Sequence, residues 1–69
     1  MNTPYTEQRT GRRTVYAVDA IGPVATVRYQ GGWVVRLEWA DGFESRRVAT
    51  RDYAEALAQR HATTIGGAL

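Results

Sequence analysis

Hydrophobic and polar residues alternate through the middle of the chain. In residues 33–40 an apolar side chain falls at every second position, which is the period of a β-strand with one buried face. Residues 14–20, 24–29 and 43–49 also have strand composition. Turn-forming residues separate these runs, namely Gly22-Pro23, the Gly-rich 30–32 and Asp41-Gly42. The pattern predicts strands joined by short turns.

The positions of the turns predict which residues pair across neighbouring strands. A two-residue loop at Asp41-Gly42 sets Arg36 directly opposite Arg47, and a three-residue loop at 30–32 sets Tyr29 opposite Trp33. Because side chains alternate between faces, one face becomes the predicted core. It carries Ala25, Val27, Tyr29, Trp33, Val35, Leu37, Trp39 and Val48. The outer face carries Val24, Thr26, Arg28, Val34, Arg36, Glu38, Ser45 and Arg47.

The segment that follows is suited to cover the core face as a helix over residues 50–62. Thr50 is a good N-cap, Asp52 lies near the positive end of the helix dipole, and strong helix formers follow. The apolar stripe that faces the sheet is predicted to contain Tyr53, Ala54, Leu57, Ala58 and His61. Gly66-Gly67 is expected to follow the helix and to end the ordered part.

These elements predict an α+β fold: a three- or four-stranded antiparallel β-meander with one C-terminal helix packed on one face. Residues 14–62 form the single domain, 1–13 a flexible basic arm and 63–69 a C-terminal tail. Whether strand 14–20 joins the main sheet is left open. The outer face of the sheet is expected to be uncovered.

Composition narrows the class of protein. The chain has 69 residues, enough for one domain, and a formal net charge of +2. It has no cysteine, which excludes disulfides, thiol catalysis and Cys-based zinc sites. No apolar run approaches the roughly 20 residues that span a bilayer, and the polar start lacks the apolar core of a signal peptide. We therefore expect a soluble, cytoplasmic protein with no membrane contact.

The sequence shows no catalytic apparatus. His61 is the only histidine and falls on the apolar stripe, where a packing or capping role is expected rather than catalysis. Gly31-Gly32 lies between strands, so it is not a phosphate-binding loop. The acidic residues lack the spacing of a metal-binding loop. The chain is expected to be a non-enzymatic binding module without metal, cofactor or small-molecule substrate.

The arginines on the outer face are the candidate binding residues. All nine basic residues of the chain are Arg, and the sequence pI is about 9.5. Arg28, Arg36 and Arg47 share the outer face, and the predicted Arg36–Arg47 opposition is unfavourable unless a polyanion relieves it. Alternatively, Glu38 neutralises the arginines diagonally and the face is an ordinary solvated sheet.

Residues 31–62, "GGWVVRLEWADGFESRRVATRDYAEALAQRHA", resemble the DNA-binding domains of plant ethylene-responsive transcription factors and the arm-binding domains of phage and transposon integrases. A strand opened by Trp33, a strand end at Val48, Thr50 and an Ala-rich helix carry the resemblance. Small proteins of actinobacteria and their phages with no assigned role are also similar. In the DNA-binding family the sheet enters the major groove, so the resemblance implies DNA contacts for Arg28, Arg36, Glu38 and Arg47.

Two functions follow from these observations. The first is a small DNA-binding protein of the phage or mobile-element type, which contacts double-stranded DNA through Arg28, Arg36, Arg47, Glu38 and Thr26, with Arg12 and Arg13 on phosphates or in the minor groove. The second is a protein-interaction module. It would be a small phage or plasmid protein that modulates a host protein, or a homodimer formed through an edge strand, with 14–20 as the candidate strand.

Overall fold

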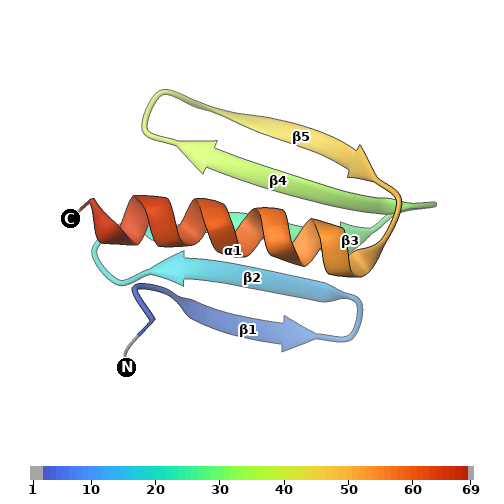
Figure 1. The fold of residues 1–69 in the computed structure, drawn as a ribbon, viewed down its shortest axis with the longest axis horizontal. Helices are drawn as coiled ribbons and strands as arrows, with labels where there is room; N and C mark the ends of the chain where they lie inside the picture. Colours follow the sequence, from blue (N-terminus) through green and yellow to red (C-terminus); the bar gives the residue numbers. More distant parts are fainter. Residues whose placement is uncertain (1–2, 69) are drawn as a thin grey trace.

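The computed structural model of this protein describes residues 3–68, in which one antiparallel sheet is followed by one helix. Each strand pairs with its neighbours in sequence, in the order β1-β2-β3-β4-β5. Figure 1 shows the helix lying across a single face of the sheet, and it packs against the three middle strands. The α+β fold with a C-terminal helix is as predicted. The elements are β1 (Thr6–Thr10), β2 (Arg13–Val18), β3 (Gly22–Tyr29), β4 (Trp33–Trp39), β5 (Gly42–Val48) and α1 (Arg51–Gly67).

The sheet has five strands, whereas three or four were predicted. The additional strand, β1, lies inside the segment 1–13 that was expected to be a flexible arm. It joins β2 through a tight turn in which Gly11 adopts the left-handed conformation, with φ of 61°. Every residue of β1 is exposed and none is apolar, so no hydrophobic alternation marks it. β2, whose membership of the sheet was left open, pairs with a neighbour on each side.

The predicted pairing is correct for one hairpin and wrong for the other. Tyr29 pairs with Trp33 across the loop at 30–32, as predicted. In the next hairpin Trp39 pairs with Gly42, so the loop is Ala40-Asp41 rather than Asp41-Gly42. β5 is therefore displaced by two residues relative to the predicted register. Since side chains alternate with a period of two, this displacement changes every cross-strand neighbour but leaves each residue on its predicted face.

A stripe of alanines brings α1 close to the sheet. Ala54, Ala58 and Ala62, spaced four residues apart, are all fully buried. Tyr53 was predicted to face the core, but its exposed fraction is 57%. Because the stripe is centred on the alanines, Tyr53 lies to one side of it and Leu57 is only half-buried. The volume of the core comes mainly from the sheet, whose largest fully buried side chains are Tyr16, Val24, Val27, Val35 and Thr14.

Val24 corrects the predicted assignment of faces at one position. It was expected on the outer face, but it is 2% exposed and belongs to the core cluster. On β2 the consecutive residues Tyr16 and Ala17 pair with Ala25 and Pro23, so Val24 has no partner and is the extra residue of a β-bulge in β3. A bulge adds a residue to one strand and interrupts the regular alternation. Val24 consequently lines a hollow together with Ile65 of α1.

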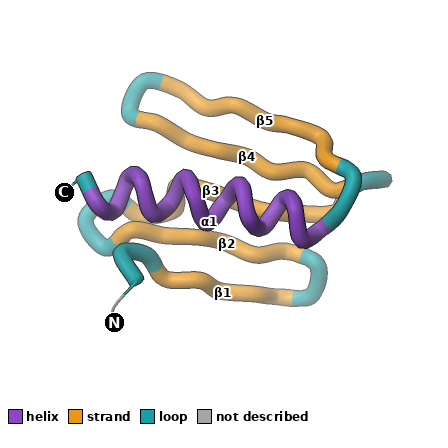
Figure 2. Tube along the Cα trace, in the orientation of Figure 1, coloured by secondary structure: helices purple, strands orange, loops and turns teal. Residues whose placement is uncertain are grey.

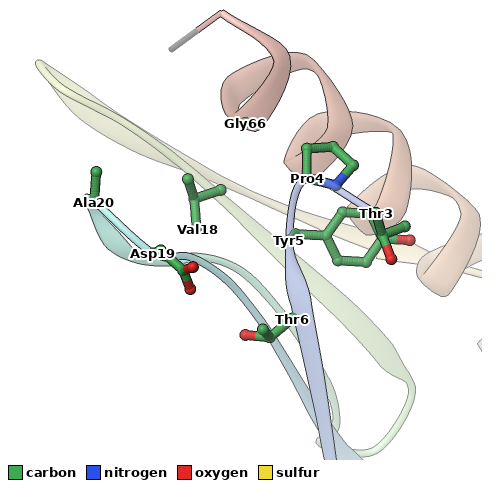
Figure 3. A pocket seen from close by; sticks show the side chains of 8 residues that line it. All are labelled: Thr3, Pro4, Tyr5, Thr6, Val18, Asp19, Ala20 and Gly66. Carbon is green, nitrogen blue, oxygen red and sulfur yellow. The ribbon is translucent and has the colours of Figure 1, made fainter. Parts of the chain in front are cut away.

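The helix starts where predicted but ends later. Thr50 is the N-cap, and its side-chain oxygen accepts a hydrogen bond from the backbone N–H of Tyr53 at 3.1 Å. The helix continues to Gly67, so Gly66 is helical and does not end the ordered part. Gly66 is needed there because the chain before β1 crosses this last turn (Figure 3). A Cβ atom at Gly66 would lie 2.4 Å from the carbonyl oxygen of Pro4.

Tyr16 is the largest of the fully buried side chains in residues 3–68. It is fully buried on β2, and its ring meets that of Tyr5 edge to face at 5.7 Å. Burial, together with the nearby carboxylates of Glu7 and Glu55, raises the pKa of Tyr16 to about 12. The folded protein therefore strongly favours the neutral phenol at this position.

We expect Gly66→Ala to lower the free energy of unfolding by about 1–3 kcal/mol, because the new methyl group must displace the Pro4 backbone. Gly67→Ala is the matched control, since nothing lies within 4 Å of a Cβ there. That change should stabilise the helix by about 0.5–1 kcal/mol through helix propensity. Denaturant unfolding of both variants tests the contact, and equal stabilisation by the two changes would contradict it.

The raised pKa of Tyr16 predicts a pH dependence of stability. Its contribution to the free energy of unfolding is fully present below pH 10, the ordinary tyrosine pKa, and is lost as the pH rises towards about 12. Tyr16→Phe should remove this contribution while keeping the ring. Denaturant unfolding of both proteins between pH 8 and 11 should show the wild type losing more stability, and parallel curves would contradict the assignment.

Candidate nucleic-acid interface

The face of the sheet opposite α1 is uncovered within residues 3–68, and we call it the open face (Figure 2). The strand pairing arranges its side chains in rows across the strands. In one row Thr26 pairs with Arg36 and Arg36 with Ser45, and in the next Arg28 pairs with Val34 and Val34 with Arg47. The charged residues of the open face are Arg13, Arg28, Arg36, Glu38 and Arg47.

Most of the predicted site residues lie on this face. Thr26 and Arg28 come from β3, Arg36 and Glu38 from β4, and Arg47 from β5. These five residues are brought together as the sequence predicted.

Arg13 and Arg12 were predicted to act together in a flexible arm, but they diverge. Arg13 belongs to β2 and is exposed next to Thr14, which is fully buried on the core side, so Arg13 faces the open side. Arg12 lies in the β1–β2 turn with its guanidinium 4.9 Å from the centre of the Tyr29 ring. Tyr29 pairs with Trp33 on the core side, so Arg12 is not part of the open face.

Arg28 and Arg47 border a shared hollow of about 340 Å³ that Val34 also lines. Arg47 donates a hydrogen bond from Nη2 to the carbonyl oxygen of Gln30 at 3.3 Å, which holds its side chain along the β3–β4 loop. The guanidinium also lies close to Gly32 of the same loop, where a Cβ would be 2.9 Å from Nη1 of Arg47. The loop therefore positions Arg47 beside the hollow.

Arg36 is held differently from its neighbours. Its guanidinium carbon lies 3.9 Å from the centre of the Phe43 ring, in a cation–π contact across the β4–β5 pair. Its Nε lies 3.8 Å from a carboxylate oxygen of Glu38 on the same strand. The aromatic platform was missed in the sequence because the predicted register set Phe43 against Ala40. Arg36 is thus stacked and neutralised within the protein.

The predicted opposition of Arg36 and Arg47 is wrong. Arg36 pairs with Ser45, and Arg47 pairs with Val34. The two-residue displacement of β5 separates the two arginines, so their repulsion across the strand pair is not a reason to expect a polyanion. The electrostatic feature that remains is the number of arginines on this face that lack a carboxylate partner within residues 3–68.

The charges of the two faces are partnered unequally. On the helix side, Arg9 and Arg51 contact Glu55 at 2.7 and 3.1 Å, and Arg46 forms an ion pair with Glu44. On the open face, Glu38 contacts Arg36 alone. No salt bridge in residues 3–68 involves the other three arginines of the open face, Arg13, Arg28 and Arg47.

Arg28 has a further unmet requirement. Its Nε, like that of Arg36, is buried and has no hydrogen-bond acceptor among the described residues. A buried donor without an acceptor is costly, and an anion with several oxygens could satisfy it together with the excess positive charge. Arg28 therefore carries a positive charge and a hydrogen-bond donor that no group of the described residues satisfies.

His61 has the packing role that the sequence suggested. Its ring meets Trp39 edge to face at 4.7 Å, and its Nε2 lies 2.8 Å from the backbone carbonyl oxygen of Glu38. Because a carbonyl can only accept, Nε2 carries the proton and donates it. In the described part of the chain, no cluster of three or more His, Cys, Asp or Glu could hold a metal ion, and no helix is long and apolar enough to cross a membrane.

No family model matches this chain, and no significant match was found among curated proteins or solved structures.

Because Arg28 of the open face lacks, within the described residues, an ion pair like the one that Arg51 forms on the helix side, replacing it should affect stability less. Arg28→Gln should leave the free energy of unfolding unchanged within about 0.5 kcal/mol, because the change removes no ion pair and relieves positive charge. Arg51→Gln removes the same charge but also the contact with Glu55 and the stacking on Trp33 at 5.2 Å. It should cost about 1 kcal/mol. Denaturant unfolding at low salt compares the two, and a larger loss for Arg28→Gln would contradict the analysis.

Proposed function

We propose that this protein binds double-stranded DNA through the open face of its sheet. The observation that carries the proposal is that Arg13, Arg28 and Arg47 share an uncovered face without a carboxylate partner. Arg residues dominate contacts with phosphates and with guanine edges because their planar fork donates two parallel hydrogen bonds. Strands are one of the elements that proteins insert into a DNA groove.

The residues of the face suit different parts of the duplex. Arg36 is oriented by Phe43 and Glu38, and an oriented guanidinium is suited to a base edge. Arg28 and Arg47 border an open hollow and are suited to phosphate oxygens, with the hydroxyl of Thr26 as a further donor. Glu38 either holds Arg36 in place or accepts a hydrogen bond from a cytosine amino group. The resemblance to the sheet-reading DNA-binding domains points to the same face.

A protein partner is the alternative function, and one observation favours it. Phe43 lies at the border of the open face with an exposed fraction of 59%, and aromatic side chains are typical anchors of protein interfaces. In the DNA proposal, Phe43 has a different role: it is the ring on which the guanidinium of Arg36 stacks. If the wild type does not bind DNA in the experiment below, the protein partner is favoured.

Titration of labelled duplex DNA at low salt tests the proposal. The wild type should bind, and the logarithm of its affinity should fall against the logarithm of salt with a slope of about −0.9 for each phosphate neutralised. Arg36→Ala should weaken binding by about 1–3 kcal/mol for a base contact. Arg28→Ala should weaken all sequences alike and reduce the salt slope by about one.

Arg60→Ala is the matched control, because Arg60 is exposed on α1, on the other side of the molecule, and the change removes the same charge. It should alter binding much less than Arg28→Ala. No binding by the wild type would overturn the proposal. Undiminished binding by a folded variant with Arg28, Arg36 and Arg47 all changed to Ala would do the same.

A further inference from the structure

The outer edge of β1 has no neighbouring strand within residues 3–68, and Figure 1 shows β1 at the border of the sheet. The strand, Thr6–Thr10, contains no proline, lysine or bulge, which commonly protect an edge strand from pairing with another chain. All five of its residues are exposed, and its two charged residues, Glu7 and Arg9, are opposite in sign. This edge therefore remains available for a further strand.

The backbone groups that point outward can be assigned from the β1–β2 turn. Thr10 pairs with Arg13 across the two-residue loop, and the residues that close such a turn are hydrogen-bonded to each other. Hydrogen-bonded and non-hydrogen-bonded pairs alternate along an antiparallel ladder. Thr10, Gln8 and Thr6 therefore use their backbone groups on β2. The N–H and C=O groups of Glu7 and Arg9 point away from the sheet.

The sequence of β1, TEQRT, is complementary to itself in the antiparallel direction. If two copies pair about Gln8, Glu7 of each lies opposite Arg9 of the other. This register also aligns the outward backbone groups, because Glu7 and Arg9 are the residues whose groups are available. A pairing centred on Glu7 or on Arg9 would also use these outward backbone groups. It would, however, place Glu7 opposite Glu7 or Arg9 opposite Arg9. Only the register centred on Gln8 satisfies both the hydrogen bonds and the charges.

The surroundings of the strand support this register. Arg9 and Arg51 both contact the single carboxylate of Glu55, so this cluster carries one positive charge in excess. Glu7 forms no salt bridge within residues 3–68. In the pair, Glu7 of the second copy would lie opposite Arg9 of the first. The excess positive charge around Arg9 and the negative charge of Glu7 would then neutralise each other. Before β1, residues 3–5 turn toward the last turn of α1, where Pro4 lies close to Gly66 (Figure 3).

We propose that two copies of this chain pair through β1 as a symmetric antiparallel dimer centred on Gln8, forming one continuous sheet. The other edge strand, β5, is a weaker candidate. It carries Glu44, Arg46 and Arg47, a net positive charge, and Glu44 is already paired with Arg46 in its own strand. Two β5 strands side by side would accumulate positive charge beside Arg36 of each copy. The proposal concerns the protein alone and does not require DNA binding.

A cysteine crosslink tests the register. The chain has no cysteine, and Gln8 on the dimer axis would occupy a non-hydrogen-bonded pair, whose Cα separation of about 4.5 Å suits a disulfide. Gln8→Cys should form a disulfide-linked dimer on mild oxidation. Thr6→Cys and Thr10→Cys on the same strand are matched controls. Each would lie roughly 13 Å from its counterpart, four residues away along the ladder, and should crosslink far less. Equal crosslinking of the three variants would overturn the proposed register.

Charge reversal tests the dimer without crosslinking, by mass measurement over a concentration series in the absence of DNA. The wild type should rise from the monomer mass of 7.7 kDa towards twice that value. Glu7→Arg and Arg9→Glu should each stay monomeric alone, yet associate with each other when mixed, because the mixture restores opposite charges at both pairs. Glu44→Arg, the matched reversal on β5, should dimerise as the wild type does.

Three results would overturn the proposal. They are a wild type that keeps the monomer mass at the highest concentration, single variants that dimerise normally, and a loss of dimer in Glu44→Arg instead of Glu7→Arg. Because folding of each variant is checked by its unfolding curve, the mixing experiment separates lost pairing from lost structure. A dimer without DNA binding would refute only the proposed function, and DNA binding by a strict monomer would refute only the dimer.

Discussion

The contact between one alanine-rich helix and the three middle strands determines how the rest of the molecule is organised. Ala54, Ala58 and Ala62 are fully buried and let the helix approach the sheet closely enough for the sheet residues to fill the core. A single helix cannot cover both faces or the full width of five strands. Within residues 3–68, the same contact that stabilises the core therefore leaves one face open and the outer edges of β1 and β5 without a neighbouring strand (Figure 1).

The alternation of side chains predicted the faces well, because a face depends only on whether a position is odd or even along its strand. Arg36 and Arg47 lie on the predicted face even though β5 is displaced by two residues. Their neighbours could not be predicted, since the choice of Ala40-Asp41 over Asp41-Gly42 as the loop changes every cross-strand pair. The contact of Arg36 with Phe43 follows from that choice. The candidate site was therefore predictable as a set of residues but not as a geometry.

The other incorrect predictions, for β1, Val24 and Tyr53, have a common physical cause. β1 has no apolar residue, so its pairing with β2 depends on backbone hydrogen bonds and the Gly11 turn, which leave no hydrophobic period. Val24 was assigned to the wrong face because a bulge interrupts the alternation. Tyr53 was assigned to the core because helical spacing alone does not say which part of a broad apolar stripe is central. In each case a local irregularity or a backbone interaction outweighed the side-chain pattern.

Pro4 lies close to Gly66 (Figure 3), so the described chain begins and ends near the same point, the last turn of α1. A domain whose ends meet can be joined to other sequences through a single point of attachment, or have its ends linked and be reopened elsewhere. Here that point lies on the helix side of the sheet. Residues 3 and 68, where the described chain begins and ends, therefore both lie away from the open face.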